Sequence, residues 1–424
     1  MRYLYTLCLV CFTPFFLLRL WWKGRTVPTY RQRILERFAL QPVTDRPEID
    51  VWVHAVSLGE VNAVIPVIER LLLKNLHVLL TTMTPSGSDR VTQYFGQKVT
   101  HQYLPYDLPG SMNRFLRQYR PRVGILMETE LWPNLILSSR KAKVPILLIN
   151  GRLSEHSFKG YCWWRCWLQS LLNQFDALLV QTADDAARFL KLGADASRVE
   201  VIGNVKFDIQ LTQDGMGRFT ALKEAWGKER VVLMLASTHD DEEKQILTHL
   251  PMLQQAIPGV LVMIAPRHPD RFERVYQLCQ RMGFNVAKGS QPAQLNEKIA
   301  VVLLDSLGEL MQAYHAVDYA FVGGSLVAVG GHNVLEPIAI GIPVFSGCQV
   351  FHFKSICETL SAMGAIQLFE SGEALIQAVI QLHLDGEAKA QQIKQATEVL
   401  TVNRGVTARY LNRIDALLAR SRFV

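Results

Sequence analysis

The chain has 424 residues, more than one typical domain of roughly 100–200 residues, so two domains are expected. With 49% hydrophobic and 20% charged residues, an intrinsically disordered chain is excluded. The formal net charge of +7 indicates an anionic partner: nucleic acid, anionic lipid or a phosphorylated substrate. The odd number of cysteines, seven in a chain this long, predicts reduced thiols, as in the cytosol, and no structural zinc site is expected.

An apolar run opens the chain. Residues 3–18 are almost all apolar, and Arg19 separates them from Trp21 and Trp22. A spanning helix needs about 20 apolar residues, and no small-residue cleavage site follows, so we predict an uncleaved membrane anchor over residues 1–22. The alternative is an amphipathic helix docked on the adjoining domain. A basic cluster then predicts that the rest of the chain lies on the cytoplasmic side, near anionic headgroups: Lys23, Arg25, Arg31, Arg33 and Arg37.

Short apolar runs then alternate with helix-like segments such as 61–73 and 184–192. The predicted strands are 51–57, 77–82, 123–128, 144–150 and 176–181, then 231–237, 260–265, 300–305, 319–323 and 343–346. This alternation predicts parallel sheets covered by helices on both faces. The expected fold class is α/β, with two Rossmann-like doubly wound domains. Ligands bind at the carboxyl ends of such strands, so two facing crevices would form one cleft for two substrates.

A polar stretch with Gly215 and Gly217 interrupts the alternation and gives the domain boundaries. We expect a first domain over 23–204, a linker over 205–218 and a second domain over 219–404. Residues 405–419 have the pattern of one helix. We expect the segment 405–424 to pack back on the first domain.

Three predicted helices begin with a polar residue followed three positions later by glutamate. One interpretation is a capping box, in which the two side chains satisfy free helix amides. The other is chemical, because a carboxylate held at such a strand end suits a general base for a sugar hydroxyl. The sequence is compatible with both interpretations. The three pairs are Ser57 with Glu60, Ser306 with Glu309 and, in variant form, Asn333 with Glu336.

Two further strand ends carry charged pairs. Glu128 and Glu130 would point the same way if the backbone stayed extended, and could divide acid and base roles or remain solvated charges. Arg267 offers a planar fork to phosphate, with His268 beside it, although a surface turn is the alternative. Lys206 falls at the predicted hinge, where a cation could reach a ligand of either domain.

The most specific stretch is the glycine-rich segment 321–337. Gly324 and Ser325 follow a strand, and a helix is predicted to begin at Asn333. Backbone amides and a helix dipole would then hold phosphate, with Glu336 gripping ribose hydroxyls. A structural glycine turn with an Asn cap is the alternative. No G-x-G-x-x-G or Walker pattern occurs, so hydride transfer and P-loop ATP chemistry are not supported.

Residues 158–175 hold Trp163, Trp164 and Trp167 beside Tyr161 and Arg165. Such an aromatic, amphipathic segment is typical of contact with a membrane interface or an acyl chain, and core packing is the alternative.

Together these motifs resemble those of the Kdo transferases, which attach 3-deoxy-D-manno-octulosonic acid (Kdo) to the lipid A precursor. METELWPN at 127–134 and GGSL with GGHNVLEP within 323–337 are the most specific. The other matching stretches follow in family order, so that the resemblance covers nearly the whole chain: 54–60, 81–87, 150–154, 206–208, 237–239, 266–272 and 305–310.

The resemblance implies a GT-B fold, with the acceptor bound by the first domain and CMP-Kdo by the second. It implies inversion at the anomeric carbon, with Glu60 as the base and Glu130 stabilising the transition state or fixing the acceptor. No metal or other cofactor is implied. The expected donor-binding residues are Lys206, Arg267, His268, Leu307, Gly308, Glu309, Gly324, Ser325, Asn333, Val334, Leu335 and Glu336.

The expected partners are CMP-Kdo, the acceptor lipid IVA and anionic lipids of the inner leaflet, and not nucleic acid. The expected location is the cytoplasmic face of a bacterial inner membrane. Three other functions fit the residues less completely: a GT-B enzyme that uses a UDP-sugar, a two-domain sugar epimerase, and a non-catalytic adaptor that binds nucleotide or anionic lipid.

Overall fold

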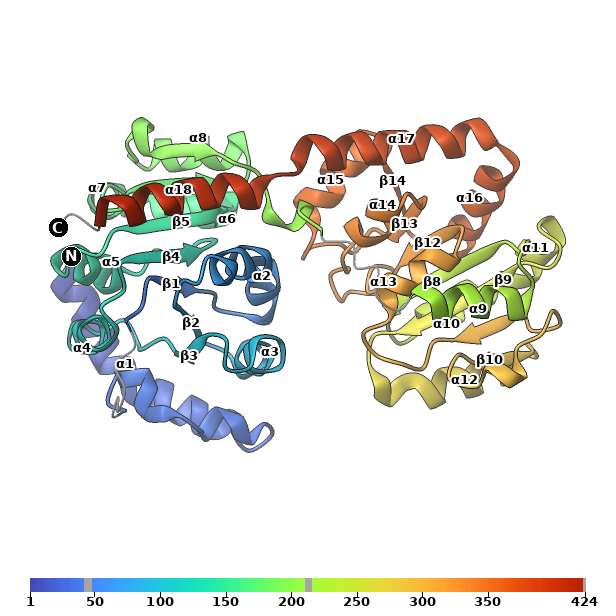
Figure 1. Ribbon diagram of the computed structural model, residues 1–424, viewed down its shortest axis with the longest axis horizontal. Coiled ribbons are helices and arrows are strands. Elements are labelled where there is room, and N and C mark those ends of the chain that lie inside the picture. Colours follow the sequence, from blue (N-terminus) through green and yellow to red (C-terminus); the bar gives the residue numbers. More distant parts are fainter. Residues whose placement is uncertain (42–47, 210–215, 422–424) are drawn as a thin grey trace. The chain divides into compact units, whose positions relative to one another are not determined.

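The computed structural model describes residues 1–41, 48–209 and 216–421 (Figure 1). The chain divides into two compact units. The first unit comprises Met1–Asp208 and Gly405–Val424, and the second comprises Ile209–Arg404. Residues 205–208 of the predicted linker therefore belong to the first unit, and 216–218 begin a helix of the second. The rest of that linker, 210–215, and the last residues, 422–424, lie outside the described residues.

The first unit is built on a parallel sheet of seven strands in the order β3-β2-β1-β4-β5-β6-β7. Its strands are β1 (Val51–His54), β2 (Val78–Thr82), β3 (Thr100–Tyr103), β4 (Val123–Met127), β5 (Ile146–Gly151), β6 (Ala177–Val180) and β7 (Val199–Val201). The central strands are buried throughout, as expected where helices cover both faces of a parallel sheet.

Two layers of helices cover this sheet. One apolar cluster joins it to α2 (Leu58–Leu73), α3 (Pro85–Phe95) and α18 (Val406–Ser421). The other cluster joins the opposite face to α4 (Pro109–Tyr119), α5 (Pro133–Lys141), α7 (Arg165–Leu172) and α8 (Ala183–Lys191). The short helix α6 (Glu155–Cys162) precedes α7.

The last helix, α18, belongs to the first unit, and Figure 1 shows it in red among the elements of that unit. The Tyr410 hydroxyl accepts a hydrogen bond from the Asn150 amide at 2.9 Å and donates one to the Gly203 carbonyl at 3.2 Å. The Asp208 carboxylate accepts from the amides of Gly405 and Thr407 at the start of the helix. These bonds fix the returning segment on the sheet of the first unit.

The second unit has its own parallel sheet, in the order β10-β11-β9-β8-β12-β13-β14. Its strands are β8 (Val232–Thr238), β9 (Leu261–Pro266), β10 (Val286–Lys288), β11 (Val301–Leu303), β12 (Tyr319–Val322), β13 (Val344–Gly347) and β14 (Ile366–Phe369). Helices α10 (Glu242–Leu247), α11 (Leu250–Ala256), α12 (Phe272–Arg281) and α16 (Gly372–Leu384) cover one face, and α9 (Met216–Trp226) and α13 (Leu310–Ala313) pack on the other. The remaining helices are α14 (Leu335–Ile340), α15 (Lys354–Ala362) and α17 (Gly386–Asn403).

All ten predicted strands are present, with ends shifted by a few residues. The sequence did not predict β3, β7, β10 and β14, which are the edge strands of the two sheets. In each sheet the strand order reverses direction at one point, between β1 and β4 and between β8 and β12. Ligands of doubly wound folds bind beside such points.

The first helix, α1 (Arg2–Lys23), has 22 residues and a hydropathy of 1.7, so by length and composition it could cross a membrane. It also contacts the first unit. The Tyr5 hydroxyl lies 3.0 Å from Asp107 Oδ2, and Arg2 Nε donates to Asn134 Oδ1 at 3.0 Å. The face of α1 that carries Arg2 and Tyr5 packs on the unit. No residue of α1 is fully buried, and the other face of the helix is exposed.

Candidate functional site

Three carboxylates gather where the strand order of the first sheet reverses. Glu60 lies in the first turn of α2, just after β1, and Glu128 and Glu130 follow β4. Both Glu128 and Glu60 raise the pKa of Glu130, and Glu128 raises that of Glu60. The three side chains therefore lie within electrostatic reach of one another at the expected ligand-binding edge.

Glu60 is a buried carboxyl group held from two sides. Its Oε2 accepts from the Val56 amide at 2.8 Å, and the Ser57 hydroxyl donates to Oε1 at 3.0 Å. Burial raises its pKa from 4.5 to about 7, the hydrogen bonds oppose that rise, and Glu128 adds to it. The predicted capping box is wrong in detail, because the Ser57 side chain accepts no helix amide. Its hydroxyl donates instead to a carboxylate, which is a stronger acceptor.

Glu130 has an even more perturbed pKa. Burial, together with the charges of Glu60 and Glu128, raises its pKa to about 8 against a hydrogen bond from Trp132. The expected strand alternation of Glu128 and Glu130 does not occur, because Glu128 has φ 57° and the chain turns there. A positive φ at a non-glycine residue is a strained conformation of the kind found at functional sites.

Lys206 lies among these carboxylates, in the short 3-10 helix Val205–Phe207. Burial lowers its pKa, Glu128 and Glu60 oppose that shift, and Arg152 adds to it. The sequence placed this cation at a hinge between domains. The structure places it in the first unit, at the edge that carries Glu60 and Glu128.

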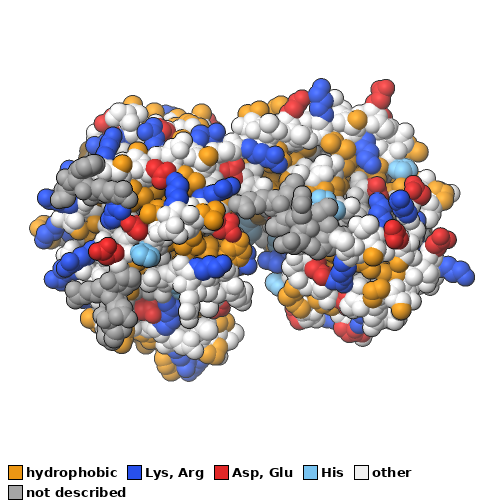
Figure 2. All heavy atoms as spheres, viewed as in Figure 1, with side chains coloured by type: hydrophobic (Ala, Val, Ile, Leu, Met, Phe, Trp, Pro, Cys, Tyr) orange, Lys and Arg blue, Asp and Glu red, His pale blue; other side chains and the backbone are white. Residues whose placement is uncertain are grey.

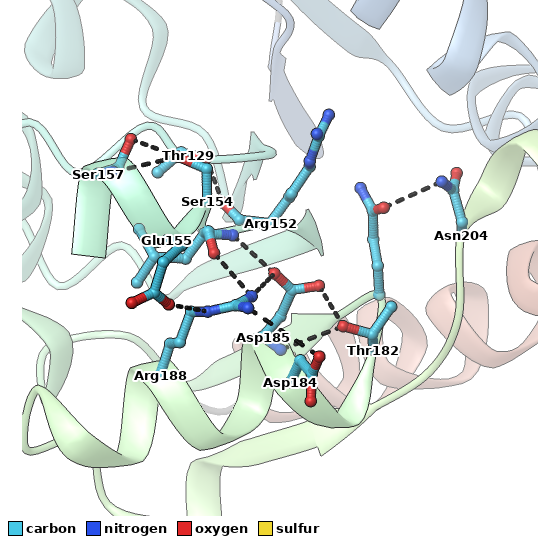
Figure 3. A network of polar contacts seen from close by, with 12 residues as sticks. Thr129, Arg152, Ser154, Glu155, Ser157, Thr182, Asp184, Asp185, Arg188 and Asn204 are labelled. Atoms are coloured by element: carbon cyan, nitrogen blue, oxygen red, sulfur yellow. Dashed lines mark hydrogen bonds and ion pairs between the residues drawn. The ribbon is translucent and has the colours of Figure 1, made fainter. Parts of the chain in front are cut away.

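A polar network supports the turn that carries Glu128 and Glu130 (Figure 3). The Thr129 hydroxyl donates to the Arg152 carbonyl, which ties this turn to the segment after β5. The next amide, of Leu153, donates to Asp185 Oδ1 at 2.8 Å, and Arg188 donates to the Leu153 carbonyl at 3.1 Å. The Arg152 side chain extends away from this network in Figure 3.

The second unit has a cluster of cationic and imidazole side chains beside its own reversal point. Arg267 and His268 follow β9 and are exposed. The His268 ring meets His239 edge-on at 5.5 Å between centroids, and His239 stacks on His332 at 5.2 Å. The Nε2 atoms of His239 and His332 are 2.9 Å apart, so one ring donates and the other accepts. Burial, with Arg267 adding to it, lowers the pKa of His332 to about 4.

Glu336 lies near this cluster. Burial raises its pKa, and a hydrogen bond from Asn333 and the charge of Arg267 oppose the rise. Helix α14 begins at Leu335 and not at Asn333, whose side chain instead donates to Glu336 at 3.1 Å and accepts from the Leu335 amide at 3.2 Å. The side chains of Val334 and Leu335 are fully buried, so only their backbone is available to a ligand.

The predicted phosphate cradle is already filled by a side chain. The buried carboxylate of Glu242 accepts from the amides of Gly324, Ser325 and Leu326 at 2.7–2.9 Å, and from the His239 amide at 2.9 Å. In this structure the amides of Gly324 and Ser325 therefore donate to Glu242 and not to a phosphate, and a role for the two residues in donor binding stays a prediction. The Ser325 side chain is also buried, where its hydroxyl donates to the Val322 carbonyl.

The turn after β11 differs from its predicted form. Ser306 does not cap a helix at Glu309, because α13 begins at Leu310 and no side chain accepts from its first amides. The Glu309 carboxylate instead accepts from the Ser306 hydroxyl and pairs with Arg218. Leu307 is 65% exposed, and Gly308 has φ 81°, so this turn presents an apolar side chain and open backbone to solvent.

Comparison with known proteins agrees with the resemblance. A family model described as 3-deoxy-D-manno-octulosonic-acid transferase (kdotransferase) matches residues 32–209. A 3-deoxy-D-manno-octulosonic acid transferase of Haemophilus influenzae is 35% identical over 99% of both chains. One of Bordetella pertussis is 36% identical over 86% of both.

The chain belongs to the Kdo transferase family. It is therefore a glycosyltransferase, and the residues matched by the family model include Glu60, Glu130 and Lys206. A crystal structure of a glycosyltransferase from Rickettsia africae is 12% identical, with a TM-score of 0.56 over 88% of this chain and 99% of that one. At this identity the likeness supports the two-domain α/β fold of the GT-B class and nothing finer.

In this Kdo transferase three residues of the candidate sites were not predicted. His239 and His332 lie in the stretches 237–239 and 330–337, and their position after strand ends is the only signal that could have singled them out. Glu242 is one of four successive acidic residues, 240–243, and no local pattern distinguishes it from its neighbours. Its role depends on a loop more than 80 positions away in the chain.

Proposed function

We propose that this protein is an inverting glycosyltransferase that moves Kdo from CMP-Kdo to lipid IVA, at the cytoplasmic face of a bacterial inner membrane. One observation carries the proposal. Burial, with the charge of Glu128 adding to it, gives Glu60 a pKa of about 7, at the point where the first sheet reverses its strand order. A general base works best when its pKa is near the working pH. Membership of the Kdo transferase family supports the choice of reaction.

In the proposed reaction the Glu60 carboxylate removes the proton of the acceptor hydroxyl. The hydroxyl oxygen then forms a bond to the anomeric carbon of Kdo, on the face opposite the nucleotide. The bond between that carbon and the phosphate oxygen breaks, and its electron pair leaves with CMP. Attack from the opposite face inverts the anomeric configuration.

Glu130 is proposed to bind the acceptor as a neutral acid. With a pKa of about 8 it is mostly protonated at pH 7, so its O–H can donate to an acceptor oxygen. Glu60, with the lower pKa, can then act as the base. Two carboxyl groups with separated pKa values are a common way to divide such roles.

The donor is proposed to bind beside Arg267 and His268. Both are exposed, and Arg267 can meet phosphate through two parallel N–H groups. The charge of Arg267 acts on Glu336, which would bind beside it, and the 307–309 turn would contact the nucleoside. Because the Gly324 and Ser325 amides are occupied, these side chains would carry the phosphate charge. Transfer also requires the two crevices to face one cleft, which stays a prediction from the sequence.

The test is incubation of the purified full-length protein with CMP-Kdo and lipid IVA, followed by mass measurement of the lipid. We expect a product heavier by whole Kdo residues, and the same turnover in the presence of EDTA. Replacing CMP-Kdo by UDP-sugars tests the alternative donor. Figure 2 shows Lys and Arg side chains interspersed with acidic ones on the visible face.

The variant Glu60→Gln should lose turnover and keep CMP-Kdo affinity, because it keeps the shape of the side chain and removes the base. Its matched control is Glu69→Gln, nine residues further along the same helix, where the carboxylate accepts from the Tyr94 hydroxyl. A non-catalytic adaptor would transfer no Kdo in either variant or in the wild type. Full turnover in Glu60→Gln would refute the assignment of the base.

A further inference from the structure

The first unit contains an apolar groove of about 590 Å³ that the proposed mechanism does not use. One wall is α1, which contributes Leu4, Cys8 and Thr13. The opposite wall is the junction of α6 and α7, with Tyr161, Trp164 and Trp167. A groove of this volume matches the usual range of ligand pockets, roughly 300–1,000 Å³.

Helix α1 is docked along the unit over most of its length. Near its start, Arg2 and Thr6 bond to Asn134 and Tyr5 bonds to Asp107. Fourteen residues after Arg2, the Phe16 ring stacks on Tyr106 with centroids 6.0 Å apart. At 1.5 Å per residue this is a contact line of about 21 Å. A helix that crossed the bilayer would have to carry its first turn away from Asp107 and Asn134, so these contacts indicate a helix lying in the membrane surface.

The outer face of α1 is apolar and exposed. Leu7, Phe15 and Leu18 have 59%, 60% and 64% of their surface exposed. Across the groove, Trp163 is 89% exposed in the short break between α6 and α7. An apolar face bordered by tryptophan is typical of helices that lie at a bilayer interface. The groove would then open where acyl chains are available.

The groove borders the turn that carries the candidate catalytic residue Glu130. Trp132 and Tyr161 both line it. The Trp132 side chain donates to Glu130, and the charge of Glu130 acts on Tyr161. Trp132 also meets the buried His54 ring edge-on at 5.8 Å. A chain lying in the groove would therefore have its head group beside Glu130 and Glu60.

We propose that α1 lies in the membrane surface as one wall of the acceptor site, and that the groove holds an acyl chain of the lipid acceptor. This rests on the proposed function. A bulk phospholipid would fit the same apolar walls, but only the acceptor has a reason to place its head group beside the carboxylates. The anchor is thus part of the substrate-binding surface and not a tether alone.

Two cysteines on α1 provide a matched pair of variants. Cys8 lines the groove and Cys11, three residues on, does not, and both are exposed. In Cys8→Trp the indole occupies the groove, so the KM for lipid IVA should rise at least about tenfold. A tenfold rise corresponds to the loss of contact with about two methylene groups of the acyl chain. Cys11→Trp should leave this KM unchanged. Neither variant should alter the KM for CMP-Kdo, or for the deacylated disaccharide as acceptor.

Equal KM values for lipid IVA in the two variants would overturn the proposal, as would an equal loss with the deacylated acceptor. If the wild type transfers Kdo to neither acceptor, the proposed function itself fails. A second pair, Leu4→Trp in the groove and Leu7→Trp outside it, repeats the comparison should one variant fold poorly. Circular dichroism checks the fold of each.

The placement of α1 has a separate test. In sealed inverted inner-membrane vesicles, whose outer surface is the cytoplasmic one, an N-terminal tag on the full chain should be cleaved by added protease without detergent. A tag protected until detergent is added would mean that α1 spans the bilayer, and would overturn the docked arrangement.

Discussion

The burial of Glu60 makes a prediction about stability that is independent of any substrate. Its pKa is 4.5 in an unfolded chain and about 7 in the folded protein, a difference worth roughly 3 kcal/mol, since each pH unit corresponds to about 1.4 kcal/mol. The folded state binds the proton more tightly, so it loses this stability as the pH rises from 4.5 through 7. Glutamine resembles the protonated acid at every pH.

Glu60→Gln should therefore be more stable than the wild type above pH 7, by roughly 3 kcal/mol, and nearly equal to it below pH 4.5. The assay is urea unfolding followed by circular dichroism, at several pH values between 4.5 and 8.5. Glu69→Gln, on the same helix, is the matched control for the chemical change itself. Over the same range the kcat/KM of the wild type should rise with an apparent pKa near 7.

A stability difference between Glu60→Gln and the wild type that stays constant with pH would refute this reasoning. It would mean that Glu60 ionises as freely in the folded protein as in the unfolded chain. The Glu60 carboxyl group could then not be the desolvated base on which the mechanism depends. A destabilised Glu60→Gln at pH 8.5 would mean that the hydrogen bonds from Val56 and Ser57 outweigh the cost of burying the charge.

Three further substitutions test other parts of the sites. Glu130→Gln, whose amide can still donate, should keep most of the acceptor kcat/KM at pH 7 and remove the decline in rate that the wild type should show above pH 8. Glu242→Ala leaves four amides without a partner, so it should lower the free energy of unfolding, measured by urea denaturation, by at least roughly 3 kcal/mol. The control Glu224→Ala, on the exposed side of α9, should change that free energy little. Arg267→Lys should weaken CMP binding about tenfold by calorimetry, because lysine lacks the planar fork.

The strands that could be predicted from the sequence are the buried, interior strands of the two sheets. Interior strands such as β1, β4 and β8 lie between two layers of helices, so they appear in the sequence as unbroken apolar runs. The edge strands β7 and β10 are three residues long and half-buried, and β14 has one buried residue. Nothing local distinguishes such segments from loops, because hydrogen bonding to one neighbouring strand is all that makes them strands.

The site was predictable where chemistry and position coincide. Glu60, Glu130 and Arg267 each follow a strand that ends at the ligand-binding edge, and a charged residue there has few structural reasons to exist. The glycine-rich loop was interpreted correctly as a backbone that donates many hydrogen bonds, but the anion that it binds in this structure was not predicted. The loop binds the carboxylate of Glu242, and only the tertiary structure brings that residue to Gly324.

The two units offer an instructive pair in Glu60 and Glu242. Each lies at the start of the helix that follows the first strand of its sheet, and each is buried. Glu242 accepts hydrogen bonds from four backbone amides, which occupy both carboxylate oxygens and leave no lone pair for a substrate proton. Glu60 accepts from Val56 and Ser57 while Glu128 and Glu130 lie nearby, so its surroundings favour the proton. The difference between a structural carboxylate and a base is thus set by what surrounds the side chain, and the same position in a βα unit can serve either purpose.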